Sequence, residues 1–480
     1  MTDTRSLFET TLKSLSSKGV RYADIRATTT SNEHVKVRNG AVENLSSATD
    51  RALGIRVLVG DGWGFAATSN HDESAVERIA MRALEVAAAS HIASTQLVEL
   101  SEVEPHIAQW SSHFEIDPWS VPLETKISHL HEATDPLRDD DRVHQVLGEI
   151  SSYRQEKIFS STEGSYIEQS TTEMGAGLEV IAIAGGEFQR RTFPNPFGGD
   201  FQARGWEFIE EVDLPANGRR IRDEAIALLT APKAPAGIHE LLIGSSQLAL
   251  QVHESCGHPA ELDRAMGLEI SLAGGSFLQP SMLGEFRYGS DLVNIVADAT
   301  VPQALGTFGF DDDGVPAQRF HLIRNGIFVD YLSGRDSATA IGRRSNGTVR
   351  AETAARIPII RMTNINLEPG ETSLEDLLAD TKKGILVDTN KSWSIDDLRL
   401  NFQFSCEVAW EIENGKVGRM LKNPTYTGIT PRFWQSCDAI GNRETWRIWG
   451  LPNCGKGDPL QTMRVAHGAP IARFRNVEMA

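Results

Sequence analysis

Three residues in the second half of the chain have the types and spacing of a metal-dependent hydrolytic site. His253 and His258 are five residues apart in the segment QVHESCGHPAEL, and Glu254 directly follows the first histidine. In helix-borne zinc hydrolases, two imidazoles bind the metal and an adjacent carboxylate accepts a proton from water. Those motifs space the histidines four residues apart, on one helix face. The extra residue leaves a second interpretation open, in which both histidines are structural and His258 stabilises a helix end.

The residues around His258 can compensate for the extra residue. Residues 245–256 are predicted to form a helix that starts at a serine cap and buries Leu248 and Val252. Pro259 disfavours helical geometry for the residue before it, and Gly257 permits a one-residue bulge or an unwound turn. A bulge would turn His258 back toward the face of His253. We therefore favour a metal site, with Glu254 as its general base rather than a solvated helix residue.

A catalytic zinc ion usually has three protein ligands, so one more must be found. Of the four cysteines, Cys406 and Cys437 lie in apolar or aromatic segments and are expected to be structural. Cys256, inside the predicted helix, is either a small core residue or a competing soft ligand. Cys454 lies in LPNCGKGDP, a predicted turn, where Lys456 would favour the thiolate. Residue chemistry favours Cys454 and leaves Cys256 as the alternative.

The remaining histidine near that cysteine is His467, in VAHGAP. Because histidines in apolar segments are more often packed residues than ligands, we expect a structural role for it.

The elements that must position these residues form two halves with different patterns. Helices are predicted near residues 3–17, 72–93 and 122–137, and strand-like runs occur between about 22 and 70 and from 142 to 192. The segment APKAPAG marks a boundary near residue 235. Beyond it the chain is mostly strand-like, with a hairpin at Asn325-Gly326 and a helix within 372–384. The sequence thus predicts an α+β protein: a mixed α/β domain with antiparallel strands and helices over 1–235, and a mainly β domain carrying the metal-binding helix over 236–480.

Composition narrows the class of protein. The 480 residues include 40% hydrophobic and 23% charged residues and carry a net charge of -18. A phosphate backbone would be repelled by such a surface, so we expect no nucleic-acid partner. We find no secretory signal and no apolar run near the roughly 20 residues of a membrane span, and four cysteines are too few for a disulfide scaffold. We therefore expect a cytoplasmic protein without membrane contact.

Several segments, in order, resemble the TldD/PmbA family of metallopeptidases, and in particular the TldD-type members with an H-E-x-x-x-H motif. The resemblance covers nearly the whole chain: ADIRATTT, VRNGAVENLSS and GIRVLVGDGWGFAATS in the first half, then HESCGHPAELD, DDDGVPAQRFHLIRNGIFVDYL and RIPIIRMTNINLEPGETSLEDLL, and CGKG near the end. The chain departs from the family pattern at Cys256 and Pro259, where TldD-like motifs carry other small or apolar residues.

The resemblance implies a zinc-dependent peptidase. One Zn²⁺ per active chain would be held by His253, His258 and Cys454, with Glu254 in catalysis. Glu261 and Asp263 match acidic positions after the motif and are expected to contact the ligands or face the substrate.

The resemblance also implies a substrate and partners. Unfolded peptides, small polypeptides or precursor peptides would enter an enclosed cavity to which residues 1–235 contribute, along with the contacts of a homodimer or of a heterodimer with a PmbA-like chain. Two alternatives stay open: a non-catalytic peptide-binding or scaffolding subunit of such a heterodimer, and a metal-dependent amidohydrolase of small molecules.

Overall fold

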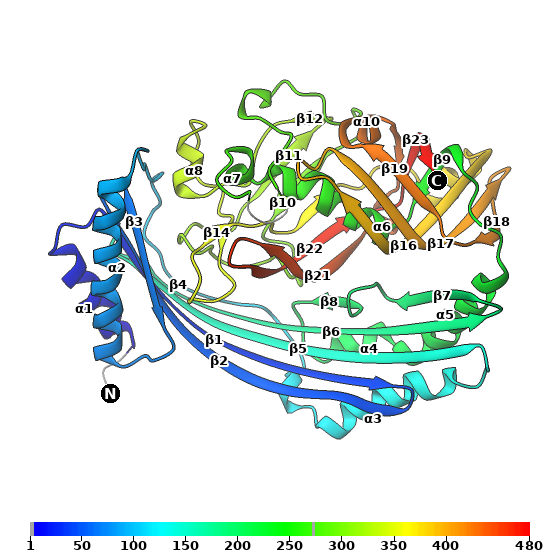
Figure 1. Cartoon of the computed structure of the whole chain (residues 1–480), viewed down its shortest axis with the longest axis horizontal. Helices are drawn as coiled ribbons and strands as arrows, with labels where there is room; N and C mark the ends of the chain where they lie inside the picture. The colour runs from blue at the N-terminus through cyan, green and yellow to red at the C-terminus, as the bar shows by residue number, and fades with distance from the viewer. Residues whose placement is uncertain (1–3, 271–273) are drawn as a thin grey trace.

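A long curved sheet forms one side of the molecule in the computed structural model, which describes residues 4–270 and 274–480 (Figure 1). Its central strands are β1 (Tyr22–Arg38), β2 (Ala41–Val59), β5 (Val143–Ser161) and β6 (Tyr166–Ala184). The order is β3-β2-β1-β5-β6-β4, and β7 and β8 also pair with β6. The shorter strands are β3 (Gly62–Thr68), β4 (Ile107–Ser111), β7 (Glu187–Phe193) and β8 (Asp200–Gln202). The pairings within this sheet are antiparallel except for β4 with β6.

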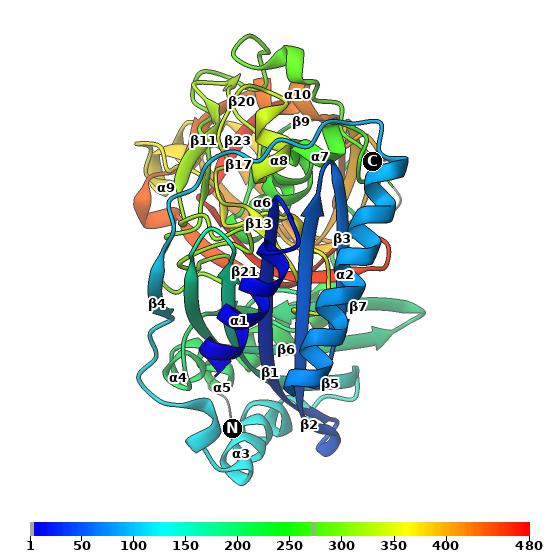
Figure 2. The ribbon, with the colours of Figure 1, turned by 90° about the vertical axis from the view of Figure 1, so that its left-hand side faces the viewer.

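Helices cover this sheet on its outer side and at one end, as Figures 1 and 2 show. They are α1 (Thr4–Ser16), α2 (Glu73–Ala93), α3 (Leu123–Thr134), α4 (Glu207–Val212) and α5 (Leu214–Thr230). α1 and α2 bury Phe8, Leu12 and Val76 against Ile25 and Val57 of the sheet. These helices confirm the ones predicted near 3–17, 72–93 and 122–137. The prediction was possible because their apolar positions recur at helical spacing.

The second half is built around a ring of strands. β9 (Gly237–Ile243), β16 (Lys383–Ile395), β17 (Asn401–Glu413), β19 (Thr425–Ile429) and β23 (Ala472–Met479) each pair with the next, and β23 pairs back with β9. β18 (Lys416–Leu421) and β20 (Cys437–Ile440) extend the sheet. Aromatic residues fill the adjoining core, including Phe404, Tyr426, Phe433 and Phe474. α6 (Ser245–Val252) packs on β16 and is buried along nearly its whole length.

Smaller sheets complete this half. β10 (Ile295–Asp298), β11 (Arg319–Arg324), β12 (Ile327–Phe328) and β15 (Ile365–Leu367) form one, and β13 (Val349–Arg350) and β14 (Ile359–Ile360) another. Short helices α7 (Leu262–Ala265), α8 (Arg335–Thr339), α9 (Leu374–Ala379) and α10 (Thr430–Gln435) lie between strands. Asn325 and Gly326 have φ angles of 48° and 73°, so the predicted hairpin turn is confirmed.

The hairpin of β21 (Arg447–Lys456) and β22 (Gln461–Ala469) lies between the two halves (Figure 1). On the side of the long sheet, the Gly450 N–H donates to Asp200 Oδ1 at 2.8 Å, and Arg464 forms an ion pair with Glu173. On its other side the hairpin contacts α6. The hairpin therefore connects the long sheet with the helix that carries the histidine motif.

The α+β fold with a mainly β second half is confirmed. Residue 235 lies between α5 and β9, and the division of the chain there stays a proposal. Over residues 4–270 and 274–480, no helix combines the length and apolar character needed to cross a membrane.

Candidate metal centre

The histidine motif ends α6 with one turn of π-helix. This turn covers His253–Gly257, and the His258 N–H donates to the carbonyl of His253, five residues earlier. A turn that is wider by one residue brings side chains five apart back to one face. The imidazole rings of His253 and His258 are 4.6 Å apart between centroids. The predicted compensation for the fifth residue is thus observed, whereas the predicted serine cap is wrong: the residue at the cap is Gly244.

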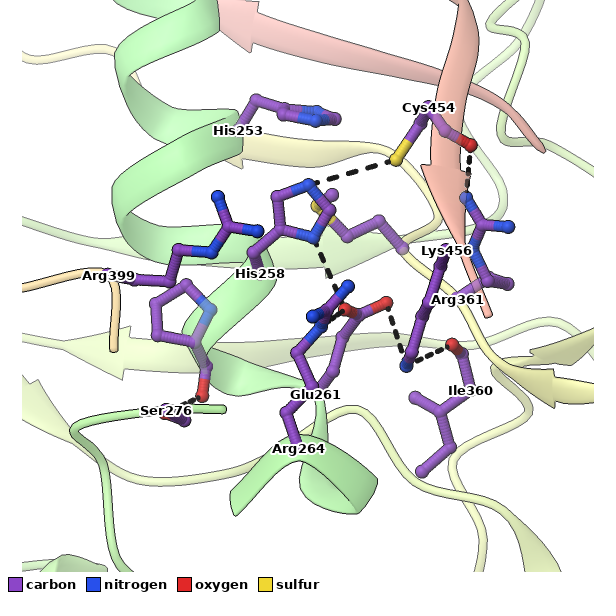
Figure 3. Close-up of polar contacts among 12 residues, drawn as sticks. His253, His258, Glu261, Arg264, Ser276, Ile360, Arg361, Arg399, Cys454 and Lys456 are labelled. Carbon is purple, nitrogen blue, oxygen red and sulfur yellow. Dashed lines mark hydrogen bonds and ion pairs between the residues drawn. The ribbon is translucent and has the colours of Figure 1, made fainter. Parts of the chain in front are cut away.

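The structure brings His253, His258 and Cys454 together (Figure 3). One potential ligand atom from each lies within 4.8 Å of the others, and all three residues are buried. Cys454 Sγ is 3.9 Å from His258 Nε2. Cys454 lies in strand β21 and not in the turn predicted from its Pro/Gly-rich surroundings. A register shift between Leu451 and Cys454 accommodates Pro452, because a bulge does not need every backbone donor.

A second histidine fixes the tautomer of His253. His467 Nδ1 is 3.1 Å from the carbonyl oxygen of Ile365, which can only accept, so this nitrogen carries the proton. Burial, reinforced by His253, holds the pKa of His467 well below its usual value, so the ring is neutral and its Nε2 accepts. That nitrogen lies 2.7 Å from His253 Nδ1, which must therefore donate. His253 Nε2 is left with a lone pair for a metal ion.

A buried carboxylate orients His258 in the same way. Glu261 Oε2 is 3.3 Å from His258 Nδ1 and 2.7 Å from Arg264 Nε, and Lys456 Nζ is 3.4 Å from Glu261 Oε1 (Figure 3). Burial alone would raise the pKa of Glu261, but Lys456 and Arg264 hold it well below its usual value. The ionised carboxylate accepts from Nδ1, so the His258 lone pair is on Nε2, the nitrogen that faces Cys454.

The protonation states suit a cation. Burial lowers the pKa of both His253 and His258 to about 4, so near neutral pH both rings are uncharged and each has a nitrogen lone pair for a metal ion. Burial would raise the pKa of Cys454, but the charge of Arg361 and the adjacent His258, which hydrogen-bonds to the sulfur, outweigh it and lower the pKa. Arg361 also donates to the carbonyl oxygen of Cys454. The cation expected to favour the thiolate was Lys456, whereas the structure assigns that effect first to Arg361.

Glu254 lies beside the cluster without being one of its three candidate ligands. Its Oε1 accepts from Trp393 Nε1 at 2.9 Å and its Oε2 from Arg399 Nη1 at 2.8 Å. The side chain of Glu254 is 7% exposed and that of Arg399 is 6% exposed. The carboxylate next to the first histidine is thus held by both oxygens, which suits a proton acceptor that must keep one orientation.

The two other candidates from the sequence lie farther out. Both oxygens of Asp263 accept from Lys456 Nζ at 2.8 Å, so Asp263 contacts the residue behind Glu261 and no histidine. Cys256 packs in the hydrophobic core, where burial raises the pKa of its thiol to about 12. Among the residues that the structure describes, its sulfur is not part of the metal-ligand group.

Several residues that complete the site are not identified by sequence reasoning. The sequence predicts a structural role for His467, and the structure adds that His467 hydrogen-bonds to a candidate ligand, His253. Its place in a strand soon after Cys454 is the signal that could have revealed it. Arg361 and Arg399 carry no such signal, because they lie about a hundred residues or more from the groups they contact.

Comparison with known proteins identifies the family of this chain. Family models described as PmbA/TldA metallopeptidase domain 1, central domain and C-terminal domain match residues 23–87, 116–229 and 241–480. A metalloprotease of Methanocaldococcus jannaschii is 29% identical over 420 residues, which cover 87% of this chain and 89% of that protein. A zinc metalloprotease TldD homolog of Saccharolobus solfataricus is 22% identical over 478 residues, 98% of each chain.

The fold also agrees with a solved structure. TldE from Thermococcus kodakarensis aligns with a TM-score of 0.74 at 18% identity, over 99% of this chain and 100% of that one. Since the matched models span most of the chain, including the residues that form the cluster, the chain belongs to the PmbA/TldD family of metallopeptidases.

Proposed function

We propose that this metallopeptidase holds a zinc ion with His253, His258 and Cys454, and that Glu254 is the general base with which it hydrolyses unfolded peptides or precursor peptides. The convergence of three buried donor atoms from two distant segments, within 4.8 Å of one another, carries the proposal. A zinc metalloprotease among the relatives supports the choice of metal.

The residues present fit a zinc ion. Two imidazole nitrogens and one thiolate form a donor set that zinc accepts in catalytic sites, with a fourth position left for water or substrate. Both imidazoles have an acceptor behind them, His467 for His253 and Glu261 for His258, and such partners fix the donor nitrogen. The donor set is therefore preorganised in protonation state as well as in position.

A zinc ion bound there would polarise the scissile carbonyl and make a water molecule more acidic. Glu254 would accept the proton of the attacking water and return it to the leaving amine. Each carboxylate oxygen has two lone pairs, so the bonds from Trp393 and Arg399 leave Glu254 able to accept that proton. His467 and Glu261 would keep the two histidines in the ligand tautomer throughout.

A peptide substrate is supported by the space around the hairpin. A cavity of about 340 Å³ lies between the long sheet and the second half, lined by Tyr153 and Glu173 on one side and by Arg350 and Arg464 on the other. Met463, the register partner of Cys454, also lines it. An extended peptide is a narrow substrate that such a space can admit, and a dimer of this chain, or of this chain with a PmbA-like one, would enclose it further.

The test combines metal analysis with an activity assay on an unfolded polypeptide such as casein. We expect one zinc per chain, cleavage that a chelator abolishes, and recovery on adding zinc. Glu254→Gln should retain zinc and lose roughly 10²- to 10⁴-fold in rate, as for loss of a general base. Cys454→Ser should lose zinc, and Cys256→Ala, the matched control, should not.

Two outcomes would contradict the proposal. Cleavage that survives both the chelator and Glu254→Gln would exclude the zinc-peptidase mechanism. Full zinc content in Cys454→Ser would exclude this ligand set. If the pure chain binds zinc but cleaves only after a PmbA-like chain is added, the active form is the heterodimer.

A further inference from the structure

Arg399 has a backbone conformation that side chains other than glycine rarely adopt. It lies between β16 and β17 with a φ angle of 65°. Its N–H donates to the Asp396 carbonyl at 2.9 Å, and its own carbonyl accepts from Thr430 Oγ1 at 2.8 Å. The left-handed region is unfavourable for a residue with a side chain, and such strain is concentrated at functional sites. The surrounding bonds hold Arg399 there, with its side chain buried beside the metal cluster.

The guanidinium of Arg399 shares the Glu254 carboxylate with Trp393. Each of the two donors bonds to a different oxygen, at 2.8 Å and 2.9 Å. Trp393 is itself positioned by Phe197, whose ring lies 5.5 Å away in an edge-on arrangement. Two donors on two oxygens leave the carboxylate one orientation, which is what a base near a reacting water requires.

The charge of Arg399 is unfavourable for metal binding alone. The guanidinium lies beside His258 (Figure 3), and its positive charge acts on both His253 and His258. A fixed cation at this place repels a divalent ion that the same histidines would bind. The ion pair with Glu254 is a contact through which Arg399 can offset this cost.

We propose that Arg399 is a positioning residue for the peptidase reaction: with Trp393 it holds Glu254 in the orientation for proton transfer, and it weakens metal binding while doing so. This inference rests on the proposed role of Glu254 as the base. It assigns Arg399 no contact with the substrate.

A double-mutant cycle on cleavage of the unfolded polypeptide tests whether Arg399 positions Glu254. Arg399→Gln should lower kcat roughly 10- to 100-fold, the usual range for a residue behind a reacting group, with a much smaller change in KM. In the Glu254→Gln background the same substitution should cost nothing further, because its target is gone. Arg399→Lys should recover part of the rate. An equal loss in both backgrounds would overturn the inference, since Arg399 would then act on the substrate directly.

The zinc dissociation constant tests whether Arg399 weakens metal binding, and it does so without relying on activity. It can be measured by competition with a chromogenic chelator. Arg399→Gln should bind zinc more tightly than the wild type. The matched control is Arg191→Gln, which removes a buried arginine from Glu407 between the two halves and should leave zinc binding unchanged. Unchanged or weaker zinc binding by Arg399→Gln would overturn the inference and make Arg399 a scaffold for the ligands.

The variants separate this inference from the proposed function. A wild-type protein that binds no zinc, or that keeps its activity in Glu254→Gln, contradicts the proposed function itself. Zinc binding and dependence on Glu254, without either effect of Arg399→Gln, contradict the inference alone. If Arg399→Gln does not fold because it leaves a buried carboxylate unpaired, Arg399→Gln/Glu254→Gln compared with Glu254→Gln still measures the change in zinc affinity.

Discussion

Replacing Asp200 by asparagine should make the protein more stable above neutral pH and leave it unchanged in acid. Asp200 lies in β8, where Oδ1 accepts from the Phe201 N–H at 2.9 Å and from the Gly450 N–H at 2.8 Å. An asparagine oxygen can accept both bonds. Burial raises the pKa of Asp200 to about 7, against partial compensation from these N–H groups. The fold therefore favours the protonated carboxyl.

The size of the effect follows from the shift. A folded-state pKa of about 7 against an unfolded value of about 3.9 makes the folded state bind the proton more tightly. The contribution of Asp200 to the free energy of unfolding is then complete below pH 4 and decreases as the pH rises toward 7. Above pH 7 the protein is less stable by about 4 kcal/mol, because each pKa unit corresponds to about 1.4 kcal/mol. Asp200→Asn removes this loss. The gain at pH 8 should approach that figure, while the two proteins should match at pH 4.

Urea denaturation followed by tryptophan fluorescence at several pH values between 4.5 and 8 would measure this difference. The control is Asp140→Asn, since hydrogen bonds from Arg142 hold the pKa of the partly exposed Asp140 far below its usual value and its carboxylate stays ionised over this range. Parallel pH profiles for Asp200→Asn and the wild type would refute the reasoning, because Asp200 would then not be the group that titrates.

Three further predictions concern the site. His467→Phe should weaken zinc binding roughly 10- to 100-fold by removing the acceptor behind His253, and His467→Gln, which can still accept, should weaken it less; competition titrations would reveal equal affinities if the hydrogen bond is irrelevant. Lys456→Met should destabilise the fold by roughly 3–5 kcal/mol in chemical denaturation, since it leaves two buried carboxylates without their shared cation, and a loss below 1 kcal/mol would contradict this. Trp393→Phe should lower kcat and leave zinc content at one per chain; loss of zinc would show that the indole supports the ligands instead.

Local patterns predicted much of the fold. The amphipathic helices and the turn at Asn325-Gly326 depend on residues close in sequence, and they are found where periodicity and turn chemistry place them. The length of β2 is less evident from the sequence. Its residues 41–51 are exposed, so they show no alternation of apolar and polar side chains. The closed ring of strands could not be predicted from the sequence, because it depends on pairing between strands such as β9 and β16, which are separated by more than a hundred residues.

The candidate site divides in the same way. His253, Glu254 and His258 are neighbours in sequence, and the glycine and proline beside His258 predicted the break in the helix. Cys454 was reached through its residue chemistry and through family resemblance, whereas its strand geometry was missed. The hydrogen-bond partners behind the ligands are contacts between distant segments, so no spacing in the sequence reveals them.

The separation of the candidate ligands along the chain has a thermodynamic consequence. His258 and Cys454 are 196 residues apart, so an ion that binds both joins the ends of a long loop. Binding that requires the folded arrangement stabilises it by RT ln(1 + [L]/Kd), about 4 kcal/mol at a thousandfold excess over Kd. The metal ion would then stabilise the fold as well as take part in catalysis. In the metal-free chain, the β21–β22 hairpin would separate more readily from α6.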